Sequence, residues 1–239
     1  MKKILKYSLV TIGILLVAAL GGFYVWTQQT YEPSGKLKEL VGKVEPEDGW
    51  VIYEPKESAK AGIVLYPGAK VEPEAYGYLA QQLSEKGYVV GIPHVPLNLA
   101  FTGVGKAEEV MKRYPSVKKW YVGGHSLGGV AAASFAHDNL DEIAGLFFLG
   151  SYPSGGDDFS KVNLPVLSIY AENDGLTSHK DIEKSKSLLP DDAVFYEIKG
   201  GNHAQFGMYG PQKGDNKAEL PVKKQQDQIV DALVSWAKP

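Results

Sequence analysis

The sequence predicts an α/β fold, in which a mostly parallel central sheet carries helices on both faces and is preceded by a single N-terminal transmembrane helix. Three observations support this. Apolar strand-like runs alternate with helix-like segments, which is typical of a parallel sheet covered on both faces. A Gly-x-Ser-x-Gly segment joins one of these runs to a helix-like one. Near the N-terminus lie about 20 apolar residues, the length that a helix needs to cross a bilayer.

The N-terminal segment indicates where the chain is located. Lys2, Lys3 and Lys6 precede an uncharged stretch over residues 7–26, and lysines on that side favour a cytoplasmic N-terminus. A cleaved signal peptide is the competing interpretation, because residues 19–21 (Ala-Leu-Gly) resemble a cleavage site. The apolar run is long for a signal peptide, so we favour an uncleaved single-pass anchor in the cell membrane. Both interpretations place the rest of the chain outside the cytoplasm, and cleavage would make it secreted.

The chain is expected to consist of three parts. Residues 1–27 are the anchor or signal sequence, residues 28–45 are a polar tether, and residues 46–239 form one α/β domain without internal repeats. Strands are expected at 50–53, 62–66, 88–92, 120–122, 144–149, 165–170 and 194–198. Helices are expected at 74–86, 107–114, 130–135, 181–189 and 225–236.

Composition excludes several classes of function. A formal net charge of −3 and the lack of a basic patch argue against nucleic-acid binding. The chain has no cysteine, which excludes disulfides, a thiol nucleophile and thiolate metal sites. We expect no metal and no organic cofactor, and the expected partners are a small ester or acyl substrate and the membrane.

The segment around Ser126 is the strongest chemical signal. Gly124-x-Ser126-x-Gly128 lies between the predicted strand 120–122 and the predicted helix 130–135. In the nucleophile-elbow pattern a strained turn lifts the serine hydroxyl above the sheet, and the flanking glycines avoid clashes with neighbouring backbone. The placement predicts acyl chemistry through Ser126.

A serine nucleophile needs a base and a group that orients the base. Asp174 and His203 each follow a later predicted strand, so Ser126, Asp174 and His203 occur in the order nucleophile, acid, base. Alternatives remain at each position. Asp174 could be an ordinary turn residue, Glu172 in the same loop could be the acid, and His203 could have a structural role. We expect His125 to pack rather than react, whereas His94 could line the site.

An oxyanion hole needs donors aimed at the developing negative charge. The backbone N–H of Leu127, at the start of a helix, is the first candidate. The N–H of Ala69, in the loop after the central strand, is the second, and Gly68 beside it permits close approach of the backbone. Gly68 as a plain turn residue is the alternative.

These motifs resemble the α/β-hydrolase superfamily, specifically the compact group called α/β-hydrolase family 5, over residues 63–236. The resemblance rests on five segments: Tyr-Pro-Gly-Ala-Lys-Val at 66–71, Pro-Leu-Asn-Leu-Ala at 96–100, Gly-Gly-His-Ser-Leu-Gly-Gly at 123–129, Glu-Asn-Asp-Gly-Leu at 172–176 and Gly-Asn-His-Ala-Gln-Phe-Gly at 201–207. It implies an eight-stranded fold or a near variant and a Ser–Asp–His triad. Members of the group are similar to esterases and dienelactone-hydrolase-like enzymes, although a serine replaces the cysteine of dienelactone hydrolases proper.

Two loops bear on the substrate. Only a short polar loop separates the strands 144–149 and 165–170, so no lid is expected there. The long loop 205–220 either shapes the substrate pocket or simply covers the domain. We therefore expect a lidless serine hydrolase, most simply a carboxylesterase that works through an acyl-enzyme. Acyl transfer to a cell-envelope component and an inactive binding module are the alternatives.

Overall fold

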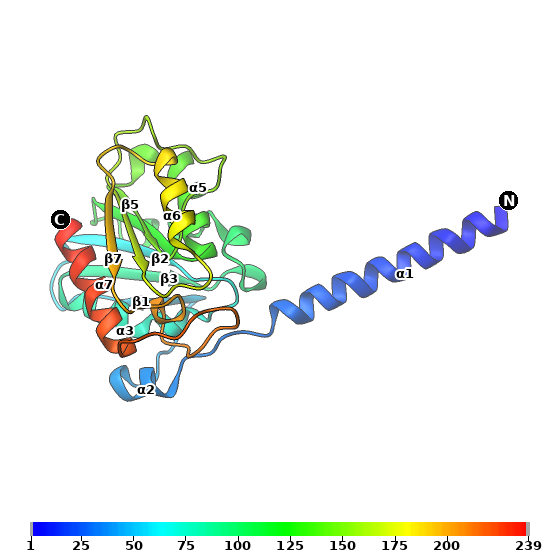
Figure 1. The fold of residues 1–239 in the computed structure, drawn as a ribbon, viewed down its shortest axis with the longest axis horizontal. Helices are drawn as coiled ribbons and strands as arrows, with labels where there is room; N and C mark the ends of the chain where they lie inside the picture. The colour runs from blue at the N-terminus through cyan, green and yellow to red at the C-terminus, as the bar shows by residue number, and fades with distance from the viewer. Residues whose placement is uncertain (1, 238–239) are drawn as a thin grey trace.

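The fold is a seven-stranded sheet between two layers of helices (Figure 1). The computed structural model describes residues 2–237. The strands are β1 (Trp50–Tyr53), β2 (Ala61–Tyr66), β3 (Tyr88–Pro93), β4 (Trp120–His125), β5 (Gly145–Leu149), β6 (Val166–Ala171) and β7 (Val194–Ile198). The helices are α1 (Lys2–Thr27), α2 (Gly35–Val41), α3 (Gly77–Glu85), α4 (Lys106–Arg113), α5 (Leu127–Asp138), α6 (His179–Ser185) and α7 (Val222–Trp236).

The strand order β1-β3-β2-β4-β5-β6-β7 creates a switch point in the middle of the sheet. Only β1 runs antiparallel to its neighbour, β3, and every other pair is parallel. The chain moves outward from β2 to β3 and then returns to the other side of β2 as β4. In open α/β sheets ligands bind outside the carboxyl ends of the strands at such a point. The loops after β2 and β4 carry Ala69 and Ser126.

The predicted α/β class is confirmed, and the seven-stranded sheet is a near variant of the eight-stranded fold, as the resemblance allows. One apolar cluster, which includes Leu79 of α3 and Ile229 of α7, fills one face of the sheet. The other face is filled by a second cluster, which includes Val110 of α4 and Phe135 of α5. The predicted helix 74–86 begins as a 3₁₀ turn at Pro73–Tyr76, and α5 starts three residues earlier than predicted, directly after Ser126.

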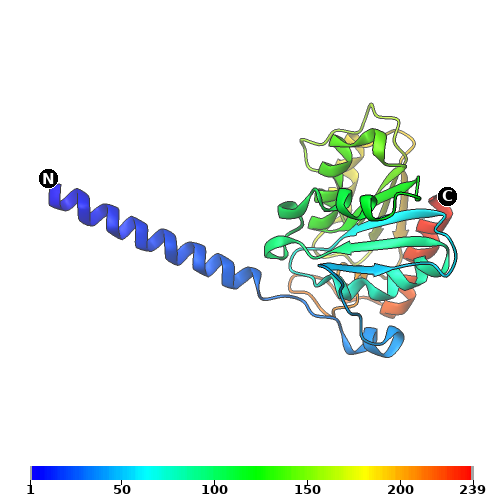
Figure 2. The same cartoon turned by 180° about the vertical axis from the view of Figure 1, so that it is seen from behind.

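Helix α1 projects from the domain as a separate rod (Figure 2). Residues 6–27 form the one helix of the described chain that is long and apolar enough to cross a membrane, and none of this segment's apolar window is buried in the domain. Length and composition make it a candidate span, and a signal sequence passes the same test.

The segment 28–45, predicted as a polar tether, contains the short helix α2. Ser34 caps this helix by accepting a hydrogen bond from the N–H of Leu37. Leu37 itself is fully buried and packs in a small cluster with Tyr78 and Met208. The sequence gives little sign of this helix, because a single buried leucine provides no periodic pattern.

Replacing Leu37 with alanine tests whether this segment contributes to the stability of the domain. We expect Leu37→Ala to lower the free energy of unfolding by about 2–5 kcal/mol, since it leaves a cavity under α2. Urea denaturation of the full chain would measure this. Glu39→Ala, on the exposed side of the same helix, is the control and should change stability by less than about 0.5 kcal/mol. Equal stability of the two variants would show that α2 is not held by Leu37.

Candidate active site

Ser126 occupies the turn between β4 and α5 in a backbone conformation that side chains rarely adopt. Its φ of 52° and ψ of −124° place a non-glycine residue at positive φ. Such strain persists only where the surrounding structure enforces it, and it is concentrated at functional sites. This conformation is the one expected for a serine raised above the carboxyl edge of a sheet.

The elbow is enforced by close backbone contacts that leave no room for side chains. A Cβ on Gly124 would lie 2.2 Å from the carbonyl carbon of Gly128, and a Cβ on Gly128 would lie 2.2 Å from the carbonyl oxygen of Tyr66. Neither obstacle can move, because both are main-chain atoms. The two glycines therefore allow α5 to start directly against the end of β2.

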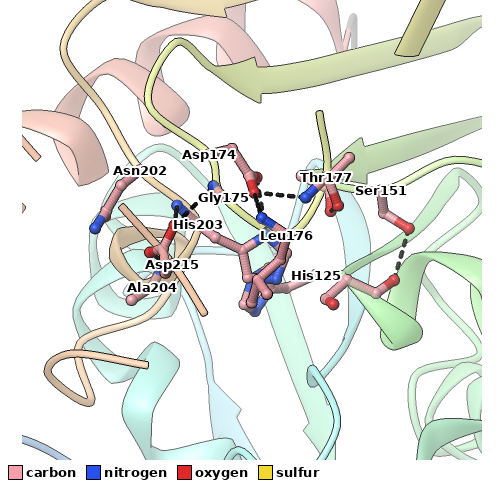
Figure 3. A network of polar contacts seen from close by, with 12 residues as sticks. His125, Ser151, Asp174, Gly175, Leu176, Thr177, Asn202, His203, Ala204 and Asp215 are labelled. Carbon is pink, nitrogen blue, oxygen red and sulfur yellow. Dashed lines mark hydrogen bonds and ion pairs between the residues drawn. The ribbon is translucent and has the colours of Figure 1, made fainter. Parts of the chain in front are cut away.

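Asp174 and His203 form a buried pair at the ends of β6 and β7 (Figure 3). Nδ1 of His203 donates to Oδ2 of Asp174 over 2.8 Å, and their side chains are 0% and 1% exposed, respectively. Oδ1 of Asp174 also accepts the backbone N–H groups of Leu176 and Thr177, at 2.8 and 2.6 Å. These three bonds fix the carboxylate, and the donated proton on Nδ1 leaves Nε2 of a neutral imidazole free as an acceptor.

Glu172, the alternative acid, lies elsewhere. Its Oε2 accepts the N–H of Gly200 over 2.8 Å, and its Oε1 is 3.7 Å from Nζ of Lys199. His94 is likewise engaged away from the pair, with its Nε2 2.9 Å from Oε1 of Glu74. The structure thus brings Asp174, and neither of these two residues, against His203.

Nε2 of His203 and the Ser126 hydroxyl differ from the groups described so far, because neither is tied to its neighbours. Nε2 of His203 is buried and makes no hydrogen bond within residues 2–237, and the Ser126 hydroxyl makes no capping bond to α5. The carbonyl oxygen of Ser126 is held by the Ser151 hydroxyl at 2.6 Å. Catalytic hydrogen bonds are often long without substrate and shorten when it binds, so the separate serine and imidazole do not argue against a shared role.

The two candidate oxyanion donors are also unoccupied. In the loop after β2, the N–H of Gly68 donates to the Tyr76 hydroxyl and that of Lys70 to the carbonyl of Asn98, but the N–H of Ala69 between them has no acceptor in the described chain. Leu127 is the first residue of α5, where N–H groups lack an acceptor within the helix.

His125 packs beneath the site, as its position in the elbow suggested. Its ring lies 4.6 Å from that of His203, and its Nδ1 is 2.8 Å from the Tyr76 hydroxyl. Burial, and secondly electrostatic repulsion from the neighbouring ring of His203, hold the pKa of His125 well below its ordinary value, so the imidazole of His125 is neutral. The Tyr76 hydroxyl accepts from the N–H of Gly68 and is hydrogen-bonded to Nδ1 of His125, so it connects the elbow to the Ala69 loop. Sequence analysis missed Tyr76, which no motif marks.

Asp215 is the second residue that the sequence did not reveal. Its Oδ1 accepts the N–H of Gly175 at 3.0 Å and that of His203 at 3.3 Å, and its Oδ2 accepts the N–H of Ala204 at 2.8 Å (Figure 3). Gly175 also packs so closely that a Cβ would lie 2.6 Å from the carbonyl oxygen of Gly214. One carboxylate thus joins the loop of Asp174 to the loop of His203.

Two loops were expected to bear on the substrate. Residues 150–165, where a lid was judged absent, contain no helix or strand. The loop 205–220 covers the histidines from the side, with the Phe206 ring 5.6 Å from that of His125. No group of three or more metal-ligating side chains occurs in the part of the chain that the structure describes.

A family model described as "Alpha/beta hydrolase family" matches residues 62–227 of the chain. Among solved structures, a monoacylglycerol lipase from Paleococcus ferrophilus is similar with a TM-score of 0.60 at 16% identity, covering 79% of this chain and 98% of that one. Est1E from Butyrivibrio proteoclasticus with bound ferulic acid is similar with a TM-score of 0.59 at 12% identity, covering 78% of this chain and 94% of that one. A predicted CIB-like hydrolase from Thermoplasma acidophilum is similar with a TM-score of 0.59 at 15% identity, covering 81% of this chain and 95% of that one. At these identities the likeness concerns the fold. No curated protein sequence matches the chain.

Replacing Asp215 with asparagine tests whether this carboxylate joins the two loops. An amide nitrogen in place of one oxygen would face backbone N–H donors, so we expect the free energy of unfolding to fall by about 1–3 kcal/mol. Urea denaturation would measure the change. Asp191→Asn, an exposed aspartate with no hydrogen bond within residues 2–237, is the matched control, and we expect it to change stability by less than about 0.5 kcal/mol. The assignment is contradicted if Asp215→Asn is as stable as this control.

Proposed function

Because the chain belongs to the alpha/beta hydrolase family, we propose that it is a serine hydrolase that cleaves carboxylic esters through an acyl-enzyme. The observation that carries this proposal is the position of Ser126. It lies at positive φ at the switch point of the sheet, and the ring of its neighbour His125 packs against that of His203, which is paired with Asp174. A serine hydroxyl, an imidazole and a carboxylate are the groups that acyl transfer needs.

Acylation begins at the Ser126 hydroxyl. As Oγ forms a bond to the carbonyl carbon of the ester, its proton moves to the unoccupied Nε2 of His203. Asp174 holds the ring in the required tautomer and stabilises the imidazolium that forms. When the tetrahedral intermediate collapses, the bond to the leaving oxygen breaks, and the proton on Nε2 passes to that oxygen to release the alcohol.

Deacylation repeats these steps with water. His203 takes a proton from the water as its oxygen attacks the acyl carbon, and then returns a proton to Ser126 Oγ as the acid leaves. In both tetrahedral intermediates the carbonyl oxygen carries a negative charge. The N–H groups of Ala69 and Leu127 are the donors that we assign to it, because each lacks another acceptor and lies at the edge where Ser126 is exposed.

The class of substrate follows from the surroundings. Among the similar solved structures, the monoacylglycerol lipase is named for an ester substrate, which favours esters over other acyl compounds. The lack of a helix or strand in residues 150–165 leaves the carboxyl edge without a cap. We further propose that α1 anchors the enzyme in the cell membrane with its catalytic domain outside the cytoplasm, as the lysines at its start favour.

Ser126→Ala tests the nucleophile directly. A fluorophosphonate probe should label the folded wild type and fail to label the variant, and kcat for p-nitrophenyl acetate should fall by about 10⁴-fold or more. Ser187→Ala, at an exposed serine in the 3₁₀ turn that follows α6, is the matched control and should label normally. Labelling that persists in Ser126→Ala would place the nucleophile elsewhere, and no labelling of the wild type would favour an inactive binding module.

A pair of isosteric changes separates the two candidate acids. Asp174→Asn should lower kcat by about 10³–10⁴-fold, because an amide cannot hold the productive tautomer of His203. Glu172→Gln should leave kcat unchanged, since its contact is with the N–H of Gly200, which an amide oxygen also accepts. Steady-state kinetics on p-nitrophenyl acetate would measure both. The opposite ranking would assign the acid role to Glu172.

A further inference from the structure

We propose that the substrate is an acyl ester whose hydrocarbon chain lies in the membrane, and that α1 holds the active-site edge of the domain against that membrane. This inference rests on the proposed esterase function and adds to it the class of ester. Two independent observations carry it: the place where α1 joins the domain, and the distribution of exposed apolar side chains.

The last turn of α1 contacts the loop that carries the candidate oxyanion donor. Nζ of Lys70 donates to the carbonyl oxygen of Trp26 over 3.2 Å and lies 4.3 Å from the centroid of its ring. A cation at this position interacts favourably with the carbonyl end of a helix. Lys70 directly follows Ala69, so the end of α1 contacts the residue next to the one whose N–H we assign to the oxyanion hole.

A second contact makes this junction rigid. Nδ2 of Asn98 donates to the carbonyl oxygen of Thr27 over 3.0 Å, and Thr27 is fully buried. The carbonyl of Asn98 in turn accepts the N–H of Lys70 over 2.8 Å, and the N–H of Tyr31 donates to the carbonyl of Lys70 over 2.7 Å. The helix end, the loop after β2 and the turn at Pro96–Asn98 therefore form one hydrogen-bonded unit.

The junction determines the distance between the site and the bilayer. Tryptophan is typical of the membrane–water interface, and Trp26 occupies the last turn of an apolar helix. With Trp26 at the interface, Lys70 and Ala69 are next to it rather than at the end of a long flexible linker. Both views show α1 leaving the domain without crossing it (Figures 1 and 2).

Exposed apolar side chains are concentrated at this same edge. Outside α1, five large apolar side chains of the described residues are exposed: Phe101, Tyr152, Leu176, Val194 and Tyr196. The first three lie in the loops that follow β3, β5 and β6, at the carboxyl edge of the sheet, with 55%, 36% and 42% of their surface exposed. We call these three residues the apolar rim.

Each member of the apolar rim is attached to a part of the site. The N–H of Leu176 donates to Asp174, Tyr152 follows the serine that binds the carbonyl of Ser126, and the turn that contains Phe101 packs on α5. An apolar rim around a site gains free energy when it enters hydrocarbon, whereas a small water-soluble ester leaves it exposed.

Apolar contact, rather than charge, is the interaction that this surface offers to a bilayer. The chain has a formal net charge of −3, which provides no attraction to anionic headgroups. Because α1 holds the domain at the bilayer, even weak contacts of the apolar rim form at a high effective concentration. A lipid with its acyl chain in the bilayer then needs to rise only to the edge of the sheet to reach Ser126.

The test uses the full chain reconstituted in phosphatidylcholine vesicles, with monoolein in the vesicles as the lipid ester and p-nitrophenyl acetate as the soluble ester. We expect Phe101→Ser to lower the ratio of monoolein to acetate hydrolysis by about tenfold, and Tyr152→Ser to lower it in the same direction. Val194→Ser, an exposed apolar residue on the edge strand β7, is the matched control and should leave the ratio unchanged.

The outcomes distinguish this inference from the proposed function. Hydrolysis of acetate that depends on Ser126, with monoolein untouched or with a ratio that Phe101→Ser and Tyr152→Ser do not change, overturns the membrane substrate and keeps the esterase. The apolar rim would then serve a protein partner or a soluble substrate. If neither ester is hydrolysed and Ser126 does not react with a fluorophosphonate, the proposed function itself fails. Acetate hydrolysis in each variant shows that the variant has folded.

Discussion

The site depends on one main-chain contact, the approach of the elbow to the end of β2. Gly124 pairs with Tyr66 across the sheet, and Gly128 lies directly against the carbonyl of that tyrosine. Only at this separation does α5 begin immediately beyond Ser126, with its first N–H pointing to the carboxyl edge of the sheet. The loop after β2 starts at the same place, so a single contact sets both candidate oxyanion donors relative to the serine.

The other half of the site is assembled by hydrogen bonds rather than by close packing. Asp215 joins the loops after β6 and β7, and this fixes Asp174 and His203 relative to each other. The two halves meet where the neutral ring of His125 packs against that of His203. A positively charged residue at position 125 would repel an imidazolium at His203, so burial of an uncharged ring there allows the base to take up a proton during the proposed reaction.

The sequence predicted the elements whose signals are local. The strand before Ser126 begins with the apolar run at 120–122 and is buried throughout, and the glycines beside the serine are needed because a side chain there would clash with main-chain atoms. Asp174 and His203 could be placed because parallel strands end at one edge. Tyr76 and Asp215 could not be placed, because their importance comes from hydrogen-bond partners far along the chain. The partners of Tyr76 are 8 and 49 positions away, and those of Asp215 that join the two loops are 11 to 40 positions away. The short helix α2 was missed because Leu37 alone gives no pattern.

The loop after β2 connects two features that are usually considered separately. It offers the N–H of Ala69 to the site and the side chain of Lys70 to the end of α1. A positive φ of 59° at Lys70 turns the chain sharply between the N–H of Ala69 and the side chain that contacts α1. On the functions proposed above, a shift of the helix end would therefore move an oxyanion donor, while a freely jointed anchor would leave it in place. The short hydrogen-bonded junction indicates that the position of α1 and the geometry of the carboxyl edge of the sheet are set together.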